Sequence, residues 1–446
     1  MNVAAVEPDP FDARRARAAR GLPAAFNAAG VLAAADVHVA VRLCELAGEA
    51  DEAVVLAAAL AVRGPRLGHV LVDLATIART ATVDQEEPVD VAALPWPDPA
   101  PWVERVRASP LVAAGDDARP LRLAGTRLYL DRYWREEADV AAALEALAGA
   151  PPASVDAAVL RDGLRRLFPE GDERQRLAAA TAVLRRLAVV AGGPGTGKTT
   201  TVARVVALLA EQAAAAGAPE PLVALAAPTA KAAARLGEAV RDAARELDAA
   251  PPIRAQLERL DASTLHRLLG RHPGSHSRFR HDRGNRLPHD VIVVDETSMV
   301  PLTLMARLLE AARRDARLVL VGDPGQLRSI EAGAVLGDIV GPAADGPLMA
   351  PAARERLADV IGAPVPAADP PPGAAIADGI VVLERVHRFG RGIGRVAEAI
   401  RLGDGDAVVA ALREGPEGVR WLAADAGDPA AQATLEPVRD AAAHAA

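Results

Sequence analysis

Residues 192–199 have the residue types and spacing with the clearest chemistry in this chain. They read Gly-Gly-Pro-Gly-Thr-Gly-Lys-Thr and fill every fixed position of a phosphate-binding P-loop. Glycines let backbone N–H groups curve around an anion, and the N-terminus of a following helix adds a favourable dipole. Lys198 would place a positive charge on the β- and γ-phosphates of ATP, and Thr199 would give a hydroxyl oxygen to Mg²⁺. The expected nucleotide contacts are Gly192, Gly193, Pro194, Gly195, Thr196, Gly197, Lys198, Thr199 and Thr200.

Two acids, Asp295 and Glu296, directly follow the apolar run 291–294. Ligands of a nucleotide-binding sheet lie at the carboxyl ends of its strands. Asp295 would then hold Mg²⁺ together with Thr199. Glu296 would polarise the attacking water as a general base.

Three other polar residues are candidates for contacts with ATP. Gln326 follows the apolar run 318–321 and could donate to the γ-phosphate, although a polar turn explains it as well. Arg388 could stabilise transition-state charge, and its local sequence also fits an ordinary surface arginine. Gln175 could read the adenine edge, and a solvated helix start explains it equally.

Two segments could grip a nucleic-acid backbone, one after the apolar run 222–226 and one near residue 264. A capped helix start with a solvated face also explains each of them. The candidate DNA contacts are Thr229, Lys231, Arg235, Thr264 and His266.

The stretch 271–290 contains five arginines and only two acids in a chain of net charge −8. A local basic patch is the expected footprint of phosphate binding, and a solvated loop is an equally good explanation. The spacing of its four histidines matches no metal motif, so they are interpreted as loop residues.

The elements that must position these residues follow from short apolar runs separated by helical patterns. This alternation predicts an α/β fold with a parallel sheet and crossover helices. Before it, residues 22–85 read mostly as helices, one of them with Val39, Leu43 and Leu46 on a single face. The strand-like runs are 121–130, 187–191, 222–226, 291–294 and 318–321, and the Ala/Pro-rich stretch 341–379 reads as a connection before a further strand-and-helix unit from Ile380.

Composition excludes several classes of protein. The 446 residues exceed one ordinary core, so two or three domains are expected. No run of about 18 strongly apolar residues predicts a membrane span, and the N-terminus lacks a secretory pattern. The single Cys44 rules out an internal disulfide and fits a reducing cytoplasm.

In their order, these segments resemble the RecD subunit of the RecBCD helicase–nuclease, a superfamily 1 helicase. The likeness covers nearly the whole chain, including Gly68-His69-Val70 and Arg127 to Trp134 in its N-terminal part. The motifs that carry it are 192–201, 227–233, 263–270, 294–300, 322–327 and 331–336.

The resemblance implies a helical partner-binding domain over 1–115, a first RecA-like P-loop NTPase lobe over 116–340 and a partial second RecA-like lobe over 341–446. The stretch 271–290 would be a basic insertion in the first lobe. The family moves five-prime to three-prime along single-stranded DNA and unwinds duplex ends in double-strand break repair, with RecB-like and RecC-like partners, and the nuclease belongs to RecB. The implied catalytic residues are Lys198, Glu296, Gln326 and Arg388, with Gln175 as the adenine contact.

Three features depart from the family pattern. Gly325 stands where the family often has an acid, and Arg328 stands where it often has a small residue or proline. The chain also stops at Ala446, before the family's later motifs. Two alternatives therefore remain open. One is a nucleotide-binding scaffold that does not translocate, and the other is a helicase that works without partners.

Overall fold

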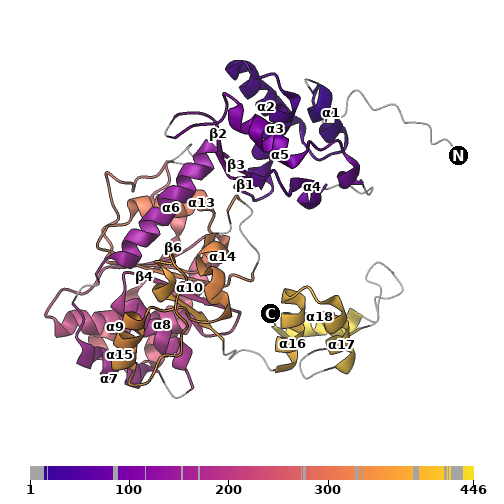
Figure 1. Ribbon diagram of the computed structural model, residues 1–446. Helices are drawn as coiled ribbons and strands as arrows, with labels where there is room; N and C mark the ends of the chain where they lie inside the picture. Colours follow the sequence, from indigo (N-terminus) through magenta and orange to yellow (C-terminus); the bar gives the residue numbers. More distant parts are fainter. Residues whose placement is uncertain are drawn as a thin grey trace. The chain divides into compact units, whose positions relative to one another are not determined.

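The computed structural model describes residues 15–17, 19–83, 89–115, 117–151, 154–168, 171–272, 274, 278–326, 331–333, 335–384, 391–415, 419, 421–422 and 435–445. These form two compact units, one within 1–191 and 198–382 and the other within 192–197 and 383–446 (Figure 1).

The N-terminal part of the first unit is mostly helical, as predicted. Its helices are α1 (Gly21–Ala28), α2 (Ala34–Ala47), α3 (Glu52–Arg66), α4 (Ile77–Thr80) and α5 (Pro99–Ala108). The alanine-rich α3 is mostly buried, and Asp51 caps it by accepting from the N–H of Ala53 at 2.8 Å. The indole N–H of Trp102 donates to the Ala53 carbonyl oxygen at 2.8 Å, which ties α5 to the start of α3.

One sequence expectation in this part was wrong, and another was incomplete. The helix with Val39, Leu43 and Leu46 on one face is present as α2, but Val39 and Leu46 are exposed, and α2 buries Val37, Ala40 and Cys44 instead. The run 121–130 is a hairpin rather than one strand. Its strands β2 (Leu121–Ala124) and β3 (Arg127–Leu130) pair antiparallel, and β1 (Leu71–Asp73) pairs with the other edge of β3.

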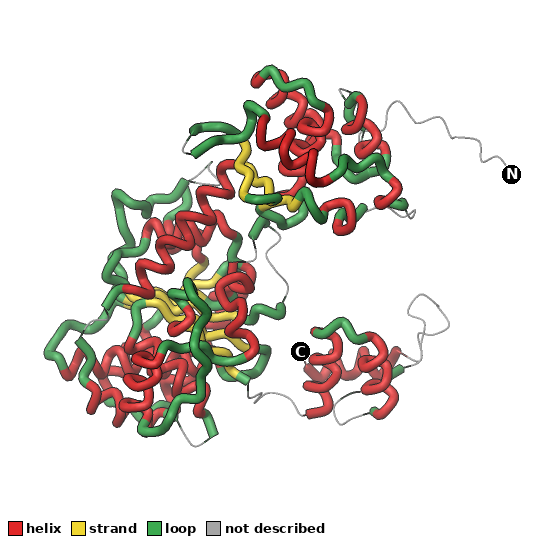
Figure 2. The backbone as a smooth tube through the Cα atoms, viewed as in Figure 1, coloured by secondary structure: helices red, strands yellow, loops and turns green. Residues whose placement is uncertain are grey.

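The larger sheet has six strands in the order β6-β5-β7-β8-β4-β9. All the pairings from β6 through to β4 are parallel, as predicted. Figure 2 shows helices on both sides of this sheet, which is the reason that β4, β5, β7 and β8 are buried on both faces. The strands are β4 (Leu187–Gly192), β5 (Val223–Ala227), β6 (Ala262–Thr264), β7 (Val291–Val294), β8 (Arg317–Gly322) and β9 (Ile380–Leu383).

Helices connect and cover these strands. The connection 341–379 also contains one, α15, with Pro351 at its first residue, where proline needs no hydrogen-bond donor. Those in the first unit are α6 (Asp131–Gly149), α7 (Ala157–Leu167), α8 (Glu173–Leu184), α9 (Lys198–Ala215), α10 (Ala230–Glu246), α11 (Pro251–Arg259), α12 (Leu265–Leu269), α13 (Leu302–Ala311), α14 (Val335–Val340) and α15 (Pro351–Ile361).

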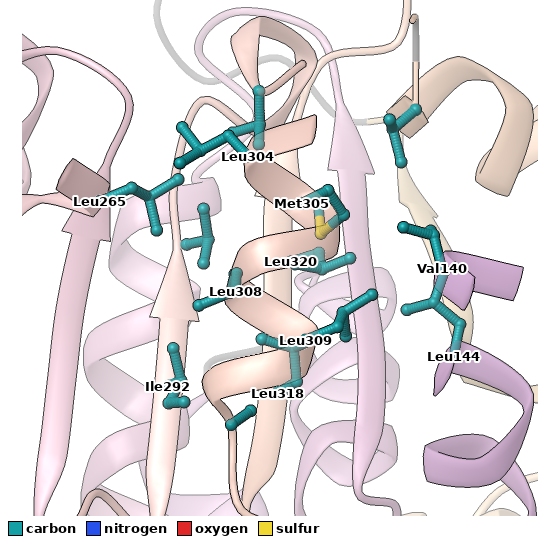
Figure 3. Packing of buried hydrophobic residues seen from close by; sticks show 14 of the residues in the cluster. Val140, Leu144, Leu265, Ile292, Leu304, Met305, Leu308, Leu309, Leu318 and Leu320 are labelled. Carbon is teal, nitrogen blue, oxygen red and sulfur yellow. The ribbon is translucent and has the colours of Figure 1, made fainter. Parts of the chain in front are cut away.

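One face of the large sheet is covered by α13 and α6 (Figure 3). Alternate strand residues, such as Ile292, Leu318 and Leu320, point to this face and meet Met305 and Leu308 of α13. The core thus holds the strands in a fixed order and register, so the residues at their carboxyl ends are held too.

The second unit contributes α16 (Arg391–Arg401), α17 (Gly405–Glu414) and α18 (Glu436–Ala445). Arg395 of α16 forms an ion pair with Glu414 of α17 at 2.9 Å.

Candidate nucleotide-binding site

The glycine-rich segment joins β4 to α9, as the sequence predicts. Gly195 and Gly197 have φ values of +76° and +82°, which only glycine adopts without strain. The Thr196 hydroxyl donates to the Gly193 carbonyl oxygen at 2.9 Å and so holds the turn closed. Lys198 is the first residue of α9, at the helix end that favours anions.

The carboxyl ends of three neighbouring strands carry the other candidates. β8 lies between β4 and β7, and the register pairs Ala191 with Gly322 and Leu320 with Val294. The turn after β8 that contains Gln326 and the Asp295 carboxyl after β7 therefore follow adjacent strands. Lys198 lies near enough to Asp295 to lower the pKa of that carboxyl.

The Asp295 carboxyl is mostly enclosed by protein, and burial raises its pKa to about 6. The N–H of Glu296 donates to its Oδ1 at 2.8 Å and opposes this rise, as does Lys198, whereas the charge of Glu296 adds to it. A divalent cation would supply the compensation that the carboxylate lacks. The donor set of Thr199 hydroxyl and Asp295 carboxylate fits Mg²⁺, which prefers oxygen ligands and completes its shell with phosphates and water.

Glu296 adopts φ 51° and ψ 41°, the only non-glycine positive φ among the described residues. A left-handed conformation costs about 1–2 kcal/mol for an L-residue, and such strain gathers at functional sites. The hydroxyl of the next residue, Thr297, donates back to the Val294 carbonyl oxygen at 2.9 Å and holds the bend. The sequence motif gave no sign of this conformation.

Gln326 lies in a turn held by Asp323. The Oδ1 of Asp323 accepts from the Gly325 N–H at 2.9 Å, and its carbonyl oxygen accepts from the Gln326 N–H at 3.2 Å. The turn follows β8 directly. Both the polar-turn interpretation and a γ-phosphate contact are compatible with this position.

Gln175 is 5% exposed, so the solvated helix start proposed as its alternative is wrong. Its Oε1 accepts from Arg204 Nη1 at 3.0 Å. Arg204 also forms an ion pair with Asp172 at 3.4 Å and lies over the Phe168 ring, 4.8 Å from its centroid. Sequence reasoning missed Arg204 because it lies 29 residues from Gln175 along the chain. It missed Phe168 because no motif marks that residue.

Thr229 and Thr264 both cap helices, as their alternative interpretation holds. Their hydroxyl oxygens accept from the backbone N–H groups of Ala232 and Arg267, each at 3.2 Å. Because Ala227 pairs with Thr264 in the sheet, the two capped helices begin next to each other, at the carboxyl ends of β5 and β6.

Other candidate DNA contacts lie near these caps. Lys231 and Arg235 are exposed on α10, one helical turn apart. The His266 ring is half-buried, and its centroid lies 5.9 Å from that of Phe279.

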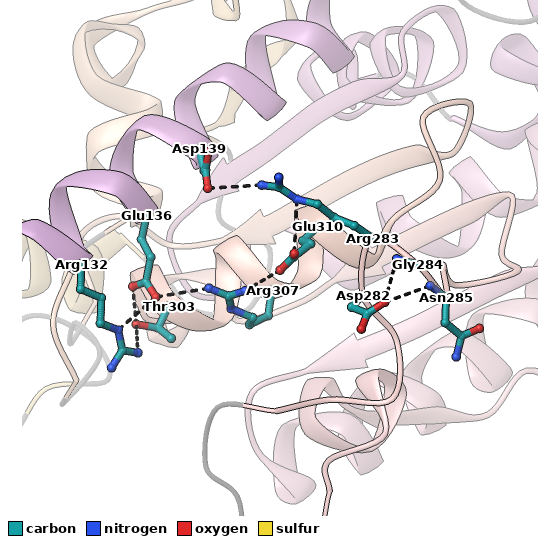
Figure 4. A network of polar contacts seen from close by, with 10 residues as sticks. All are labelled: Arg132, Glu136, Asp139, Asp282, Arg283, Gly284, Asn285, Thr303, Arg307 and Glu310. Atoms are coloured by element: carbon teal, nitrogen blue, oxygen red, sulfur yellow. Dashed lines mark hydrogen bonds and ion pairs between the residues drawn. The ribbon is translucent and has the colours of Figure 1, made fainter. Parts of the chain in front are cut away.

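The basic stretch 271–290 is partly tied to the scaffold. Arg283 pairs with Asp139 of α6 at 3.4 Å and with Glu310 of α13 at 3.3 Å (Figure 4). Arg286 donates to the Ala312 carbonyl oxygen, whereas the Arg280 side chain is exposed. Burial lowers the pKa of His289, and no group of three or more possible metal-binding His, Cys, Asp or Glu residues occurs in the described ranges.

Arg388 and Arg328 lie outside the described residues. Among the helices that the structure describes, none is long and apolar enough to cross a membrane.

Two family models match the chain. Residues 28–129 match the RecBCD enzyme subunit RecD, N-terminal domain, and residues 175–332 match the AAA domain.

Curated relatives agree with these matches. RecBCD enzyme subunit RecD of Mycobacterium tuberculosis is 53% identical over 423 residues, which is 94% of this chain and 64% of the relative. The same subunit of Mycolicibacterium smegmatis is 51% identical over 89% of this chain and 63% of its own length. The ATP-dependent RecD2 DNA helicase of Deinococcus radiodurans is 37% identical over 46% of this chain and 25% of that protein. The chain thus spans slightly less than two thirds of the length of the first two relatives.

Among solved structures, the Pif1 helicase of Candida albicans aligns with 17% identity and a TM-score of 0.29, covering 56% of this chain and 50% of that one.

Proposed function

Because the chain belongs to the RecD family, we propose that it is an ATP-hydrolysing DNA helicase subunit of a RecBCD-type helicase–nuclease. The observation that carries this proposal is the order of β4, β8 and β7, which brings the charges of Lys198 and Asp295 together at the carboxyl ends of these strands. A lysine beside a partly buried carboxylate at strand ends is the arrangement that a nucleotide with Mg²⁺ needs.

In this proposal, the backbone N–H groups of 192–197 and the Lys198 ammonium bind the phosphates of ATP. Thr199 and Asp295 hold Mg²⁺, which neutralises phosphate charge when bound. Glu296 orients and polarises the attacking water. Gln326 contacts the γ-phosphate.

Three assignments complete the nucleotide site. Thr200, the third residue of α9, follows Lys198 and Thr199 at the phosphates. Gln175 reads the adenine edge, and the Arg204 hydrogen bond to its Oε1 fixes the orientation of its amide. Arg388 is assigned the positive charge that stabilises the transition state.

For DNA, we assign the edge of the sheet where β5 and β6 end. Thr229, Lys231 and Arg235 on one side and Thr264 and His266 on the other would contact the backbone of a single strand, and movement would run five-prime to three-prime. The exposure of Lys231 and Arg235 supports this assignment, since phosphate contacts need accessible cations.

The assembly part of the proposal concerns partners. RecB-like and RecC-like chains would bind the N-terminal part, the RecB-like chain would carry the nuclease, and the complex would repair double-strand breaks in the cytoplasm. The match of residues 28–129 to the RecD N-terminal domain supports this.

The decisive experiment measures DNA-stimulated ATP hydrolysis by the Lys198→Ala variant. The rate of hydrolysis should fall to background. A rate equal to that of the unaltered chain would contradict the assignment. Arg165→Ala is the matched control, because Arg165 is an exposed cation on α7 paired only locally with Asp162. A single-turnover unwinding assay then separates a motor from a scaffold, because a scaffold would bind ATP and DNA without unwinding.

A further inference from the structure

A cavity of about 450 Å³ opens between the small antiparallel sheet and the helices α6, α13 and α14. Its volume is in the range of sites that enclose small ligands or large side chains. Apolar side chains from both sides line it, including Val70 and Leu71 near β1, Val140 and Leu144 of α6, Leu302 of α13 and Ile339 of α14.

The charged residues at this cavity are mostly acidic. Glu137 and Glu145 of α6 and Asp338 of α14 line it, against a single cation, Arg127 of β3. Burial and the nearby charge of Asp338 raise the pKa of Glu137, whereas its hydrogen bond with Tyr129 and the charge of Arg127 lower it. Glu137 and Asp338 thus lie close enough to repel each other, Arg127 offsets part of this repulsion, and a further cation in the cavity would relieve more of it.

Gly333, which lines the cavity, joins the N-terminal part to the segment that follows the Gln326 turn. The Gly333 N–H donates to the Gly68 carbonyl oxygen at 3.2 Å. Gly333 has a φ of +102°, and a Cβ atom there would lie 2.7 Å from Leu302 Cβ. This contact therefore requires glycine, and it fixes the shape of the cavity.

We propose that this cavity is a docking site for a segment of a partner protein that inserts a large apolar side chain next to a lysine or arginine. The apolar walls suit the first group, and the excess of carboxylates suits the second. The inference rests on the proposed assembly with RecB-like and RecC-like chains, since Val70, Leu71, Arg127 and Tyr129 lie within the 28–129 match.

The experiment titrates the full chain with the co-expressed RecB-like and RecC-like pair and measures the dissociation constant. Ala141 is exposed and lines the cavity, so Ala141→Trp fills it without disturbing the core. Glu145→Arg reverses one of the carboxylates. Ala142→Trp and Ala146→Arg are the matched controls, because both residues are exposed on α6 but do not line the cavity.

Both cavity variants should bind the pair at least tenfold more weakly, with unchanged melting temperatures, and both controls should bind within twofold of the unaltered chain. Binding by Ala141→Trp and Glu145→Arg equal to that of the controls would overturn the docking site alone. Failure of the unaltered chain to bind the pair would instead overturn the proposed partnership, and the docking site with it.

Discussion

The backbone N–H of Glu296 donates to the Oδ1 of Asp295 at 2.8 Å, so the two acids at the end of β7 hold each other in place. Glu296 itself adopts the left-handed conformation, and the hydrogen bond from the Thr297 hydroxyl to the Val294 carbonyl oxygen holds this bend. A proposed metal ligand and a proposed general base therefore share one strained turn.

The first prediction is that Asp295→Asn stabilises the nucleotide-free chain at pH 7. The pKa of Asp295 is about 6 in the folded chain and near 3.9 in an unfolded one, so its ionisation destabilises the fold as pH rises from about 4 through 6. The gain should be up to about 3 kcal/mol, since each pKa unit corresponds to about 1.4 kcal/mol. Urea unfolding measures it, and the gain should disappear below about pH 4. A variant less stable than the unaltered chain at pH 7 would contradict this.

The second prediction concerns the strain at Glu296. Glu296→Asn should raise the free energy of unfolding by roughly 1 kcal/mol, because asparagine tolerates a left-handed φ better. The same variant should bind ATP but hydrolyse it about 10²–10⁴-fold more slowly through loss of the general base. Glu296→Gln is the control, since it removes the base while keeping a side chain of similar shape. Equal stability of the two variants would refute the role of strain.

A third prediction separates capping from DNA contact at the sheet edge. Thr229→Ala and Thr264→Ala should each lower stability by about 1 kcal/mol, because each removes a helix cap. Thr229→Ser should retain the cap. Lys231→Ala should leave stability unchanged yet weaken binding to single-stranded DNA and lower its salt dependence. If Lys231→Ala binds DNA with the salt dependence of the unaltered chain, Lys231 is not a phosphate contact.

Cys44 provides a fourth prediction. Burial, with a smaller contribution from Glu49, raises the pKa of its thiol to about 11. Because only the thiolate reacts, the folded chain should not react with a disulfide reagent at pH 8. Denaturant should release one reactive thiol per chain, as the sequence contains one cysteine. Rapid labelling without denaturant would show that the N-terminal core opens.

The parts of the site that could be predicted are those encoded within a few residues. The P-loop flanks and the acids after 291–294 were predictable, since strand, turn and helix signals are local. The burial of Gln175 was not, because it depends on Arg204, which is 29 residues away. The buried face of α2 was not predictable for a similar reason, because helical spacing defines a face but not which face packs against the core.

The basic stretch shows the same limit over a longer distance. Counting arginines in 271–290 could not reveal that Arg283 pairs with Asp139, which is 144 residues away. Helix α15 was not predicted because it lies in an Ala/Pro-rich stretch that reads as a connection. Its proline lies in the first turn, where proline is compatible with a helix.

The network in Figure 4 joins α6 to two neighbours by links of unequal strength. Glu136, whose side chain is 7% exposed, accepts from Thr303 of α13 at 2.7 Å, a partly buried link that costs more to break than an exposed one. The Arg283 and Asp139 side chains are 67% and 64% exposed, and such a pair contributes at most about 1 kcal/mol and weakens with salt.

The joint between α6 and α13 is therefore rigid, whereas the joint between α6 and the stretch 278–290 can be released. The 19-residue helix α6 thus moves together with α13, whereas its contact with the basic stretch is weak and reversible. A polyanion that competes for Arg283 would separate this stretch from α6 without changing the packing of α6 on α13.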